Sequence, residues 1–272
     1  MAHREGQASA VGRLLGNTSI GQVGPLKSEA GSGEATRTRF PAPKDVPTTW
    51  GQLAHHVLVS GVILGTAIFA PSQLPSTPLV IFMFLYSDAY SAVLHATLDC
   101  EAALDLPVLG PAAAGFQMHH DHPLASTMGV GLYRLLCDTV RIQWVTGVCA
   151  LLFAGHTPLS ARILVLKWVM CAYGTQMGHY WSHMPLSKRP MVVRFLQWLH
   201  LLLPCDHHVR GHHAPPHNKN FAIVSGLSNP FLNPLLKHAT WATLLPSWLF
   251  MTLFDIALIE RLFSTGPLAT FA

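Results

Sequence analysis

Charged residues are scarce in this sequence. Of its 272 residues, only 11% are Asp, Glu, Lys or Arg, whereas an average soluble domain has about 25%. Half of the residues are hydrophobic. The net charge of +4 comes without a dense basic block or basic residues interleaved with aromatic ones, so we expect no nucleic-acid partner. The composition favours a protein embedded in a lipid bilayer.

Motifs of several competing chemistries are absent as well. The sequence has no Gly-x-Ser-x-Gly, Walker A or Gly-x-Gly-x-x-Gly element, and no flavin, haem or iron–sulfur motif. The five cysteines contain no Cys-x-x-Cys pair, which argues against a disulfide framework or a thiolate–metal site. We expect them to pack as small apolar side chains; they are Cys100, Cys137, Cys149, Cys171 and Cys205.

The composition changes near residue 48. Residues 1–48 are rich in Gly, Ser, Ala, Thr and Pro and have no apolar period, so they are predicted to be a disordered N-terminal tail. Several arginines and few acids make this tail a candidate targeting segment. Residues 49–238 form the predicted functional domain, and residues 239–272 a C-terminal apolar segment.

Six apolar runs follow the tail. The first has 18 residues and would span about 27 Å as a helix, close to the thickness of the hydrocarbon core. The fifth run, residues 191–203, is shorter and is predicted to be a re-entrant or interfacial helix. The last run, residues 241–258, is interrupted by Pro246 and either spans the membrane or lies at its surface. We therefore predict an all-α integral membrane protein with about four transmembrane or re-entrant helices. The runs are residues 53–70, 78–98, 140–154, 159–177, 191–203 and 241–258.

Histidine is abundant instead. There are 17 histidines, and most of them fall in clusters at the ends of the apolar runs or just after them. Residues four apart in a helix project from the same face and can converge on one ion; this spacing relates His95 to Asp99, His179 to His183 and His208 to His212. The clusters are His95 with Asp99; His119, His120 and His122; His179 with His183; and His207, His208, His212 and His213.

Imidazoles without thiolates suit iron, zinc, copper or nickel. One ion needs three or four protein ligands, and the clusters offer more than eight, so two metals at the membrane surface are predicted. A zincin peptidase would need Glu directly after the first histidine of its motif, a position that Tyr180 occupies. Solitary histidines are interpreted as interfacial or hydrogen-bonded residues; they include His55, His56, His156 and His238.

The motifs together resemble the Kua-type lipid desaturase domain family, which includes plasmanylethanolamine desaturases and a plant chloroplast desaturase of phosphatidylglycerol palmitate. The resemblance covers residues 50–238. It rests on Gln176-Met-Gly-His-Tyr-Trp-Ser-His183, Leu196-Gln-Trp-Leu-His200, Leu203-Pro204, His207-His208, His212-His213, Pro216-His217, Ile223-Val-Ser-Gly226 and, upstream, on Asp88, His95, Asp99, Leu106-Pro-Val-Leu-Gly110 and Phe116-Gln-Met-His-His120.

The resemblance implies a set of metal ligands. Three residues separate the last two histidine pairs where the family usually has two, which leaves His207 and His208 as alternatives, and the i,i+4 relation to His212 favours His208. His122, His200 and His217 are interpreted as lying outside the ligand set. Asp88, Asp121 and Asp206 are placed to accept the second N–H of ligating histidines. The implied ligands are His95, Asp99, His119, His120, His179, His183, His207 or His208, His212 and His213.

The resemblance also implies an activity. Two iron ions would activate O2 to desaturate a membrane phospholipid chain, with electrons from an external protein such as cytochrome b5 or ferredoxin. The alkyl chain of a plasmanylethanolamine is slightly favoured as substrate, and an acyl chain of a phospholipid such as phosphatidylglycerol is the alternative. A lipid hydroxylase with the same metal centre is the competing enzyme. A histidine-rich membrane metal-binding or transport protein is the alternative of a different class. An endoplasmic reticulum or plastid membrane is expected.

Overall fold

A computed structural model describes residues 40–41, 49–69, 74–107, 109–138, 140–214 and 217–271. Within these ranges every regular element is a helix, which confirms the predicted all-α class. The predicted N-terminal tail lies outside the described residues except for 40–41, and so do Ala70 of the first apolar run and Pro216 of the family motif.

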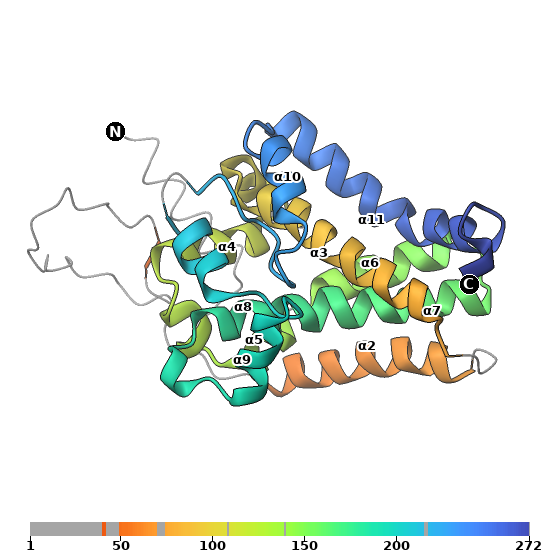
Figure 1. The fold of residues 1–272 in the computed structure, drawn as a ribbon, viewed down its shortest axis with the longest axis horizontal. Coiled ribbons are helices and arrows are strands. Elements are labelled where there is room, and N and C mark those ends of the chain that lie inside the picture. Colours follow the sequence, from red (N-terminus) through yellow and green to blue (C-terminus); the bar gives the residue numbers. More distant parts are fainter. Residues whose placement is uncertain are drawn as a thin grey trace, which may run out of the picture.

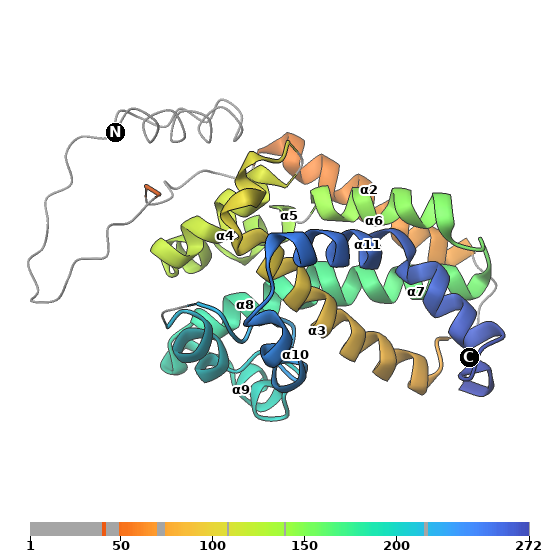
Figure 2. The same cartoon turned by 90° about the horizontal axis from the view of Figure 1, so that it is seen from above.

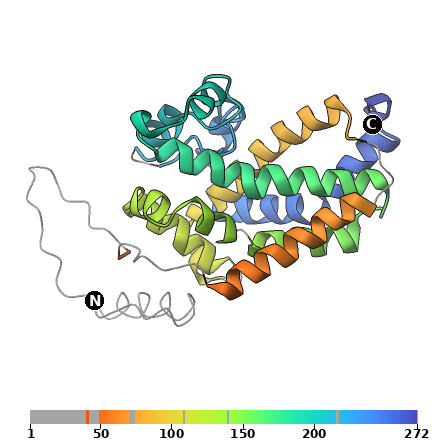
Figure 3. The same ribbon diagram turned by 90° about the horizontal axis from the view of Figure 1, so that it is seen from below.

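The body of the fold is a bundle of long helices (Figure 1). In it, α11 packs against α3, α6 and α7, and α2 packs against α6 and α7. The C-terminus lies at one end of the bundle in all three views (Figures 1, 2 and 3). The helices of the bundle are α2 (Trp50–Phe69), α3 (Thr77–Asp99), α6 (Val140–Phe153), α7 (Pro158–Lys167) and α11 (Trp241–Ser264).

The ends of these helices follow from local sequence. Ser76 caps α3 by accepting a hydrogen bond from the Leu79 amide, and a proline occupies the first turn, where its missing N–H costs nothing. Thr157 and Ser160 form a capping box at the start of α7. The turn-like sequence Gly155-His-Thr-Pro158 predicts a reversal of the chain, and the chain does reverse there, between the end of α6 and the start of α7.

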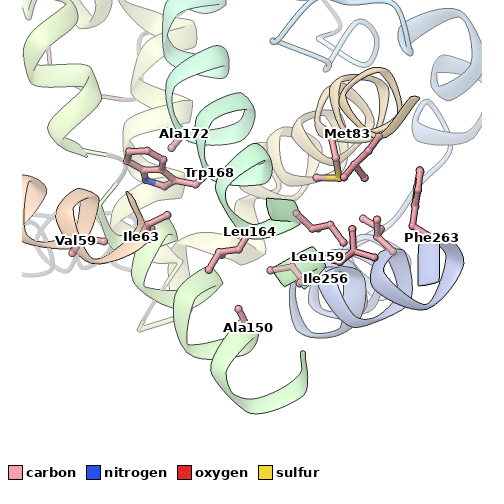
Figure 4. Close-up of a cluster of buried hydrophobic side chains, with 13 residues drawn as sticks. Val59, Ile63, Met83, Ala150, Leu159, Leu164, Trp168, Ala172, Ile256 and Phe263 are labelled. Atoms are coloured by element: carbon pink, nitrogen blue, oxygen red, sulfur yellow. The ribbon is translucent and has the colours of Figure 1, made fainter. Parts of the chain in front are cut away.

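Apolar side chains from six helical segments meet in the main core, shown in Figure 4. Burial of this surface is the dominant favourable contribution to folding. Because α11 supplies part of the core, the C-terminal apolar segment packs in the same body as the histidine-rich part. The labelled residues are Val59, Ile63, Met83, Ala150, Leu159, Leu164, Trp168, Ala172, Ile256 and Phe263.

A buried ion pair adds a polar link between three helices of the bundle. Lys167 at the end of α7 lies 2.5 Å from Asp255 on α11, and both side chains are almost completely buried. Tyr86 on α3 donates its hydroxyl hydrogen to the same carboxylate oxygen at 2.6 Å. Removing one partner of such a pair would leave a buried charge without compensation.

Helix α7 continues without a break into the histidine-bearing helix α8 (Thr175–His183) through a π-helical segment, η3 (Trp168–Gly174). A π turn holds more residues than an α turn, so it changes the face that later side chains present. The predicted apolar run at 159–177 thus extends to His183, and η3 sets the direction of the histidines relative to the apolar face of α7.

Two helices among the described residues, α3 and α11, are long and apolar enough to cross a membrane. Helix α3 is the more buried of the two inside the protein, whereas α11 leaves more of its surface free. Helix α11 runs on past Pro246 without interruption, so this proline does not divide the last apolar run.

Candidate metal centre

Two helices that carry histidine clusters, α4 (Gly110–Asp121) and α8, lie at the end of the bundle opposite the C-terminus (Figures 1 and 3). Four segments supply the clusters: the C-terminal turns of α3, helix α4, helix α8, and the π-helical segment η5 (Asp206–His212) with the residue that follows it. They form two groups of potential ligand atoms. In each group, these atoms lie within 4.8 Å of one another.

We call one of the two groups the five-histidine group, because among the described residues all of its potential ligands are imidazoles. The Nε2 atoms of His119 and His179 are 2.7 Å apart, and those of His208 and His213 are 3.2 Å apart. Four of these rings are buried and the fifth, His213, is partly buried. The members are His119, His179, His183, His208 and His213.

The other set, the Asp99 group, combines three imidazoles with one carboxylate: His95, Asp99, His120 and His212. His120 Nε2 lies 3.2 Å from Asp99 Oδ1. His95 Nε2 and His212 Nε2 each lie 3.5 Å from Asp99 Oδ2. All three histidines therefore direct the same ring nitrogen toward the carboxylate.

The two groups adjoin each other. His119 and His120 are neighbours in sequence, and so are His212 and His213, yet each pair contributes one ring to each group. The rings of His120 and His213 belong to different groups, and their centroids are only 5.1 Å apart. The arrangement could hold two ions side by side.

Hydrogen bonds to the far ring nitrogens fix the tautomer of three histidines. His95 Nδ1 donates to the Phe221 carbonyl and His212 Nδ1 to the Lys219 carbonyl, each at 2.9 Å. His119 Nδ1 lies 2.8 Å from Ser126 Oγ, which itself donates to a backbone carbonyl and so accepts from the ring. Each Nε2 then carries a lone pair directed into its group, as in protein metal sites.

Within the described part of the chain, three buried atoms inside the groups have no hydrogen-bond partner: His95 Nε2, Asp99 Oδ2 and His183 Nε2. An unsatisfied buried polar atom is costly unless something binds it. A cation would satisfy all three. Neutral imidazoles and one carboxylate suit iron, and equally other first-row transition metals, so the donors fit the predicted metal class.

The protonation state also favours metal binding. Burial lowers the pKa of His119 and of His208 well below the usual value, and the nearby rings of His179 and His183 lower both further. Burial likewise lowers the pKa of His213. Neutral imidazole is the form that binds a metal, and these three rings therefore have it at neutral pH.

Of the two sequence alternatives, the structure brings His208 into the five-histidine group and leaves His207 outside both groups. The His207 ring packs against His200 with centroids 5.3 Å apart. The expected pairing of His208 with His212 on one ion does not occur either, because η5 is π-helical. The amide of His213 donates to the His208 carbonyl, so His208 pairs with His213 while His212 enters the Asp99 group.

The three aspartates expected to accept histidine N–H groups have other partners in the structure. Asp88 accepts the backbone amides of residues 225, 226 and 228, Asp121 accepts from the Phe40 amide, and the exposed Asp206 pairs with Arg210. The carbonyls of Lys219 and Phe221 take the expected role instead. Sequence spacing could not reveal them, because a carbonyl acceptor has no residue signature.

Three histidines interpreted from the sequence as lying outside the ligand set, His122, His200 and His217, belong to neither group. His217 lies against the Asp99 group, with its Nδ1 3.2 Å from His120 Nδ1. His122 contacts the Phe40 carbonyl, and the His200 ring packs on His207.

Fold and site together define a helical protein with two adjoining histidine-rich groups of potential metal ligands. Residues 84–245, more than half of the chain, match the family model of the lipid desaturase domain. The chain therefore belongs to the lipid desaturase domain family, as the sequence motifs indicated.

Two kinds of relative are similar to the chain. A plasmanylethanolamine desaturase of Myxococcus xanthus is 34% identical over 185 residues, which cover 61% of this chain and 62% of that protein. Plasmanylethanolamine desaturase 1 of Mus musculus is 32% identical over 172 residues, 56% of this chain and 60% of that protein. Fatty acid desaturase 4-like 1, a chloroplastic protein of Arabidopsis thaliana, is 29% identical over 150 residues, 55% of this chain and 50% of that protein.

The matched part of the chain thus corresponds to between half and two thirds of the length of these relatives. No solved structure matches the chain.

Proposed function

We propose that this chain is a membrane-bound, non-haem di-iron desaturase that introduces a double bond into a phospholipid chain. The observation that carries the proposal is the pair of adjoining ligand groups inside a lipid desaturase domain. Because every predicted ligand except His207 falls into one of the two groups, their geometry supports two ions per chain.

Iron bound in both groups would supply, with O2, the oxidising power that removes two hydrogens from adjacent carbons. Two electrons and two protons are also needed, so that O2 leaves as two molecules of water. The sequence has no redox motif of its own, and we propose an external electron donor such as cytochrome b5 or ferredoxin. The protein contributes the fixed tautomers of His95, His119 and His212, which keep the ligand nitrogens oriented.

We place the bundle in the bilayer with the metal groups at the membrane surface. Helices α3 and α11 have the length and apolarity to span it, and α2 and α6 expose apolar side chains such as Val62 and Leu151. Together with the hairpin of α6 and α7, these helices support about four transmembrane or re-entrant segments. The metal groups would then lie on the cytosolic or stromal side of an endoplasmic reticulum or plastid membrane, where reductants are available.

Helix α9 (Met191–Trp198) supports this position of the metal groups. Its face toward the protein is narrow, with Val193 and Gln197 buried, while Met191 is 85% and Trp198 73% exposed. Basic residues accompany the exposed apolar side chains; Arg194 is one. Apolar and aromatic side chains combined with cations are typical of a helix that lies at the lipid headgroups. Helix α9 connects α8 to η5, so a headgroup position of α9 would bring both ligand-bearing segments near that surface.

For the substrate we favour the alkyl chain of a plasmanylethanolamine, which would become the vinyl ether of a plasmalogen. The similarity to the bacterial and mouse plasmanylethanolamine desaturases supports this choice. An acyl chain of a phospholipid such as phosphatidylglycerol is the second candidate, favoured by the similarity to chloroplastic fatty acid desaturase 4-like proteins.

The test is lipid analysis of cells with and without the protein, complemented by the wild type or by His179→Ala, His183→Ala, His212→Ala or His213→Ala. We expect vinyl-ether phospholipids to appear with the wild type only, while all variants still insert into the membrane. Monounsaturated phosphatidylglycerol as the only new lipid would select the second substrate. Unchanged lipids together with exchangeable zinc would contradict the enzyme and favour a metal-binding or transport protein. His55→Ala, which changes a ring tilted against Trp144 outside both groups, is the control.

A further inference from the structure

A buried stretch of chain runs between the two metal-bearing helices α3 and α8. It comprises residues 219–228, which we call the connector; residues 221–226 are all buried. The connector precedes α10 (Asn229–Leu236) and contains no helix of its own. Buried backbone outside regular structure needs other hydrogen-bond partners, and here side chains of α3 provide them.

Three residues on one face of α3 bind the connector in order. Asp88 is completely buried, and its Oδ1 accepts the amides of Ser225 and Gly226 at 2.7 and 3.0 Å. Its Oδ2 accepts the amide and the hydroxyl of Ser228 at 2.8 and 2.7 Å. Four donors thus compensate one buried carboxylate.

The next two residues of α3 that contact the connector are Ser91 and His95, and His95 is a member of the Asp99 group. Ser91, one turn further along α3, accepts the Ile223 amide at 3.1 Å. One turn beyond that, His95 Nδ1 donates to the Phe221 carbonyl at 2.9 Å. Positions 88, 91 and 95 share a helix face, so the connector runs antiparallel to α3 and presents its carbonyl to the ligand at the end of this series.

The connector also touches the opposite helix. A Cβ atom at Gly178 would lie 2.5 Å from the Ile223 carbonyl oxygen and 2.8 Å from that of Val224, so only glycine permits this approach. Gly178 directly precedes His179 of the five-histidine group. At its other end the connector receives the His212 Nδ1 hydrogen on the Lys219 carbonyl.

We infer that Asp88 is a positioning residue for the Asp99 group and acts on it through the connector. Its carboxylate holds the backbone whose carbonyls orient His95 and His212, two of the three imidazoles of that group. Among the described residues, Asp88 forms its hydrogen bonds with the connector and none with a member of either group, so its effect is on ligand orientation. The inference rests on the proposed di-metal function.

The test compares Asp88→Asn with the wild type in the full-length protein, by Co²⁺ titration of the metal-free form followed by absorption. Asparagine has one acceptor oxygen where Asp88 has two, and its NH2 group would face N–H donors of the connector instead of accepting from them. We expect Co²⁺ binding at the Asp99 group to weaken about 10- to 100-fold, with an altered spectrum, while binding at the five-histidine group is retained. A purely structural role would lower the melting temperature and leave both binding steps intact, which would overturn the inference, as would equal loss at both groups.

A milder pair of variants decides the matter if Asp88→Asn does not fold. Ser91→Ala removes a single acceptor from the connector, whereas Ser87→Ala changes a serine of the same helix that is equally buried and forms no hydrogen bond with the connector. Only Ser91→Ala should weaken the Asp99 group; identical titrations would contradict the inference. Wild-type protein that fills both groups with Co²⁺ but changes no lipid would contradict the proposed function alone, and wild type without Co²⁺ at the Asp99 group would contradict both.

Discussion

His208 and His213 approach each other at 3.2 Å between their Nε2 atoms, although five positions separate them along the chain. The π-helical segment η5 brings this about, because its hydrogen bonds connect residues five apart, as from the His213 amide to the His208 carbonyl. The three-residue spacer between the last two histidine pairs is thereby accommodated, and His212 is free to serve the neighbouring group.

Shortening this spacer should therefore disturb both groups. Deletion of Val209 removes the additional residue of the π turn and rotates the histidines before it relative to those after it by about 100°, the rotation of one helical residue. We expect loss of iron from both groups, measured as iron per chain after reconstitution. Val209→Ala keeps the spacing and should retain the wild-type content; a deletion variant with full iron would show that the spacer length is irrelevant.

The two adjacent histidines at the start of η5 should behave differently. His208→Ala removes a member of the five-histidine group and should reduce product formation by more than about 100-fold. Loss of a residue that only hydrogen-bonds a metal ligand typically costs about 10- to 100-fold, and loss of the ligand itself should cost more. His207→Ala changes a ring outside both groups and should leave most of the activity and iron. Equal effects of the two substitutions on iron content would refute this assignment.

The hydroxyl of Ser126 should matter for metal affinity. Ser126→Ala deprives His119 Nδ1 of its acceptor and should weaken metal binding about 10- to 100-fold. Competition with a coloured chelator measures this change. Ser126→Thr keeps the hydroxyl and is expected to restore much of the affinity, whereas an alanine variant with wild-type affinity would show that this hydrogen bond does not contribute.

Helix packing provides a prediction on stability. Lys167→Met leaves the Asp255 carboxylate buried without its cation and should lower the free energy of unfolding by about 3–5 kcal/mol. Thermal unfolding in detergent is the measurement. The double variant Lys167→Met with Asp255→Leu removes both charges and should recover most of the loss; if it is less stable than Lys167→Met, the ion pair is not the cause.

Helix α9 can be located by cysteine labelling in liposomes. Trp198→Cys should react more slowly with a membrane-impermeant maleimide than Lys188→Cys, because only the former side chain is expected to enter the lipid. Peptide mass spectrometry separates these sites from the five native cysteines. Equally fast labelling at both positions would place the apolar face of α9 in water.

Much of the helical framework could be predicted from apolar runs and turn residues. The run at 78–98 corresponds to α3, and the turn at residues 155–158 separates α6 from α7. Local rules suffice here because a cap, a proline or an apolar stripe acts within one or two turns. The number of membrane spans could not be settled in this way, since length and apolarity identify only α3 and α11 among the described residues.

The ligand pairs show where spacing succeeds and where it does not. His179 and His183 lie in one group, and so do His95 and Asp99, as helical spacing of four predicts. His208 and His212 have the same spacing but lie in different groups, because the backbone between them is π-helical. The role of Asp88 was also misjudged, because its partners lie 137 to 140 residues away.

The Asp99 carboxylate has a further consequence. Among the described residues it belongs to one ligand group only, so a divalent cation there would have one unit of its charge cancelled, while a cation among the five neutral imidazoles would keep both. The latter ion would be the stronger electrophile and the easier of the two to reduce. With both groups filled, the two ions would therefore be chemically inequivalent before any substrate arrived, and the ion among the five imidazoles would be the preferred acceptor of an incoming electron.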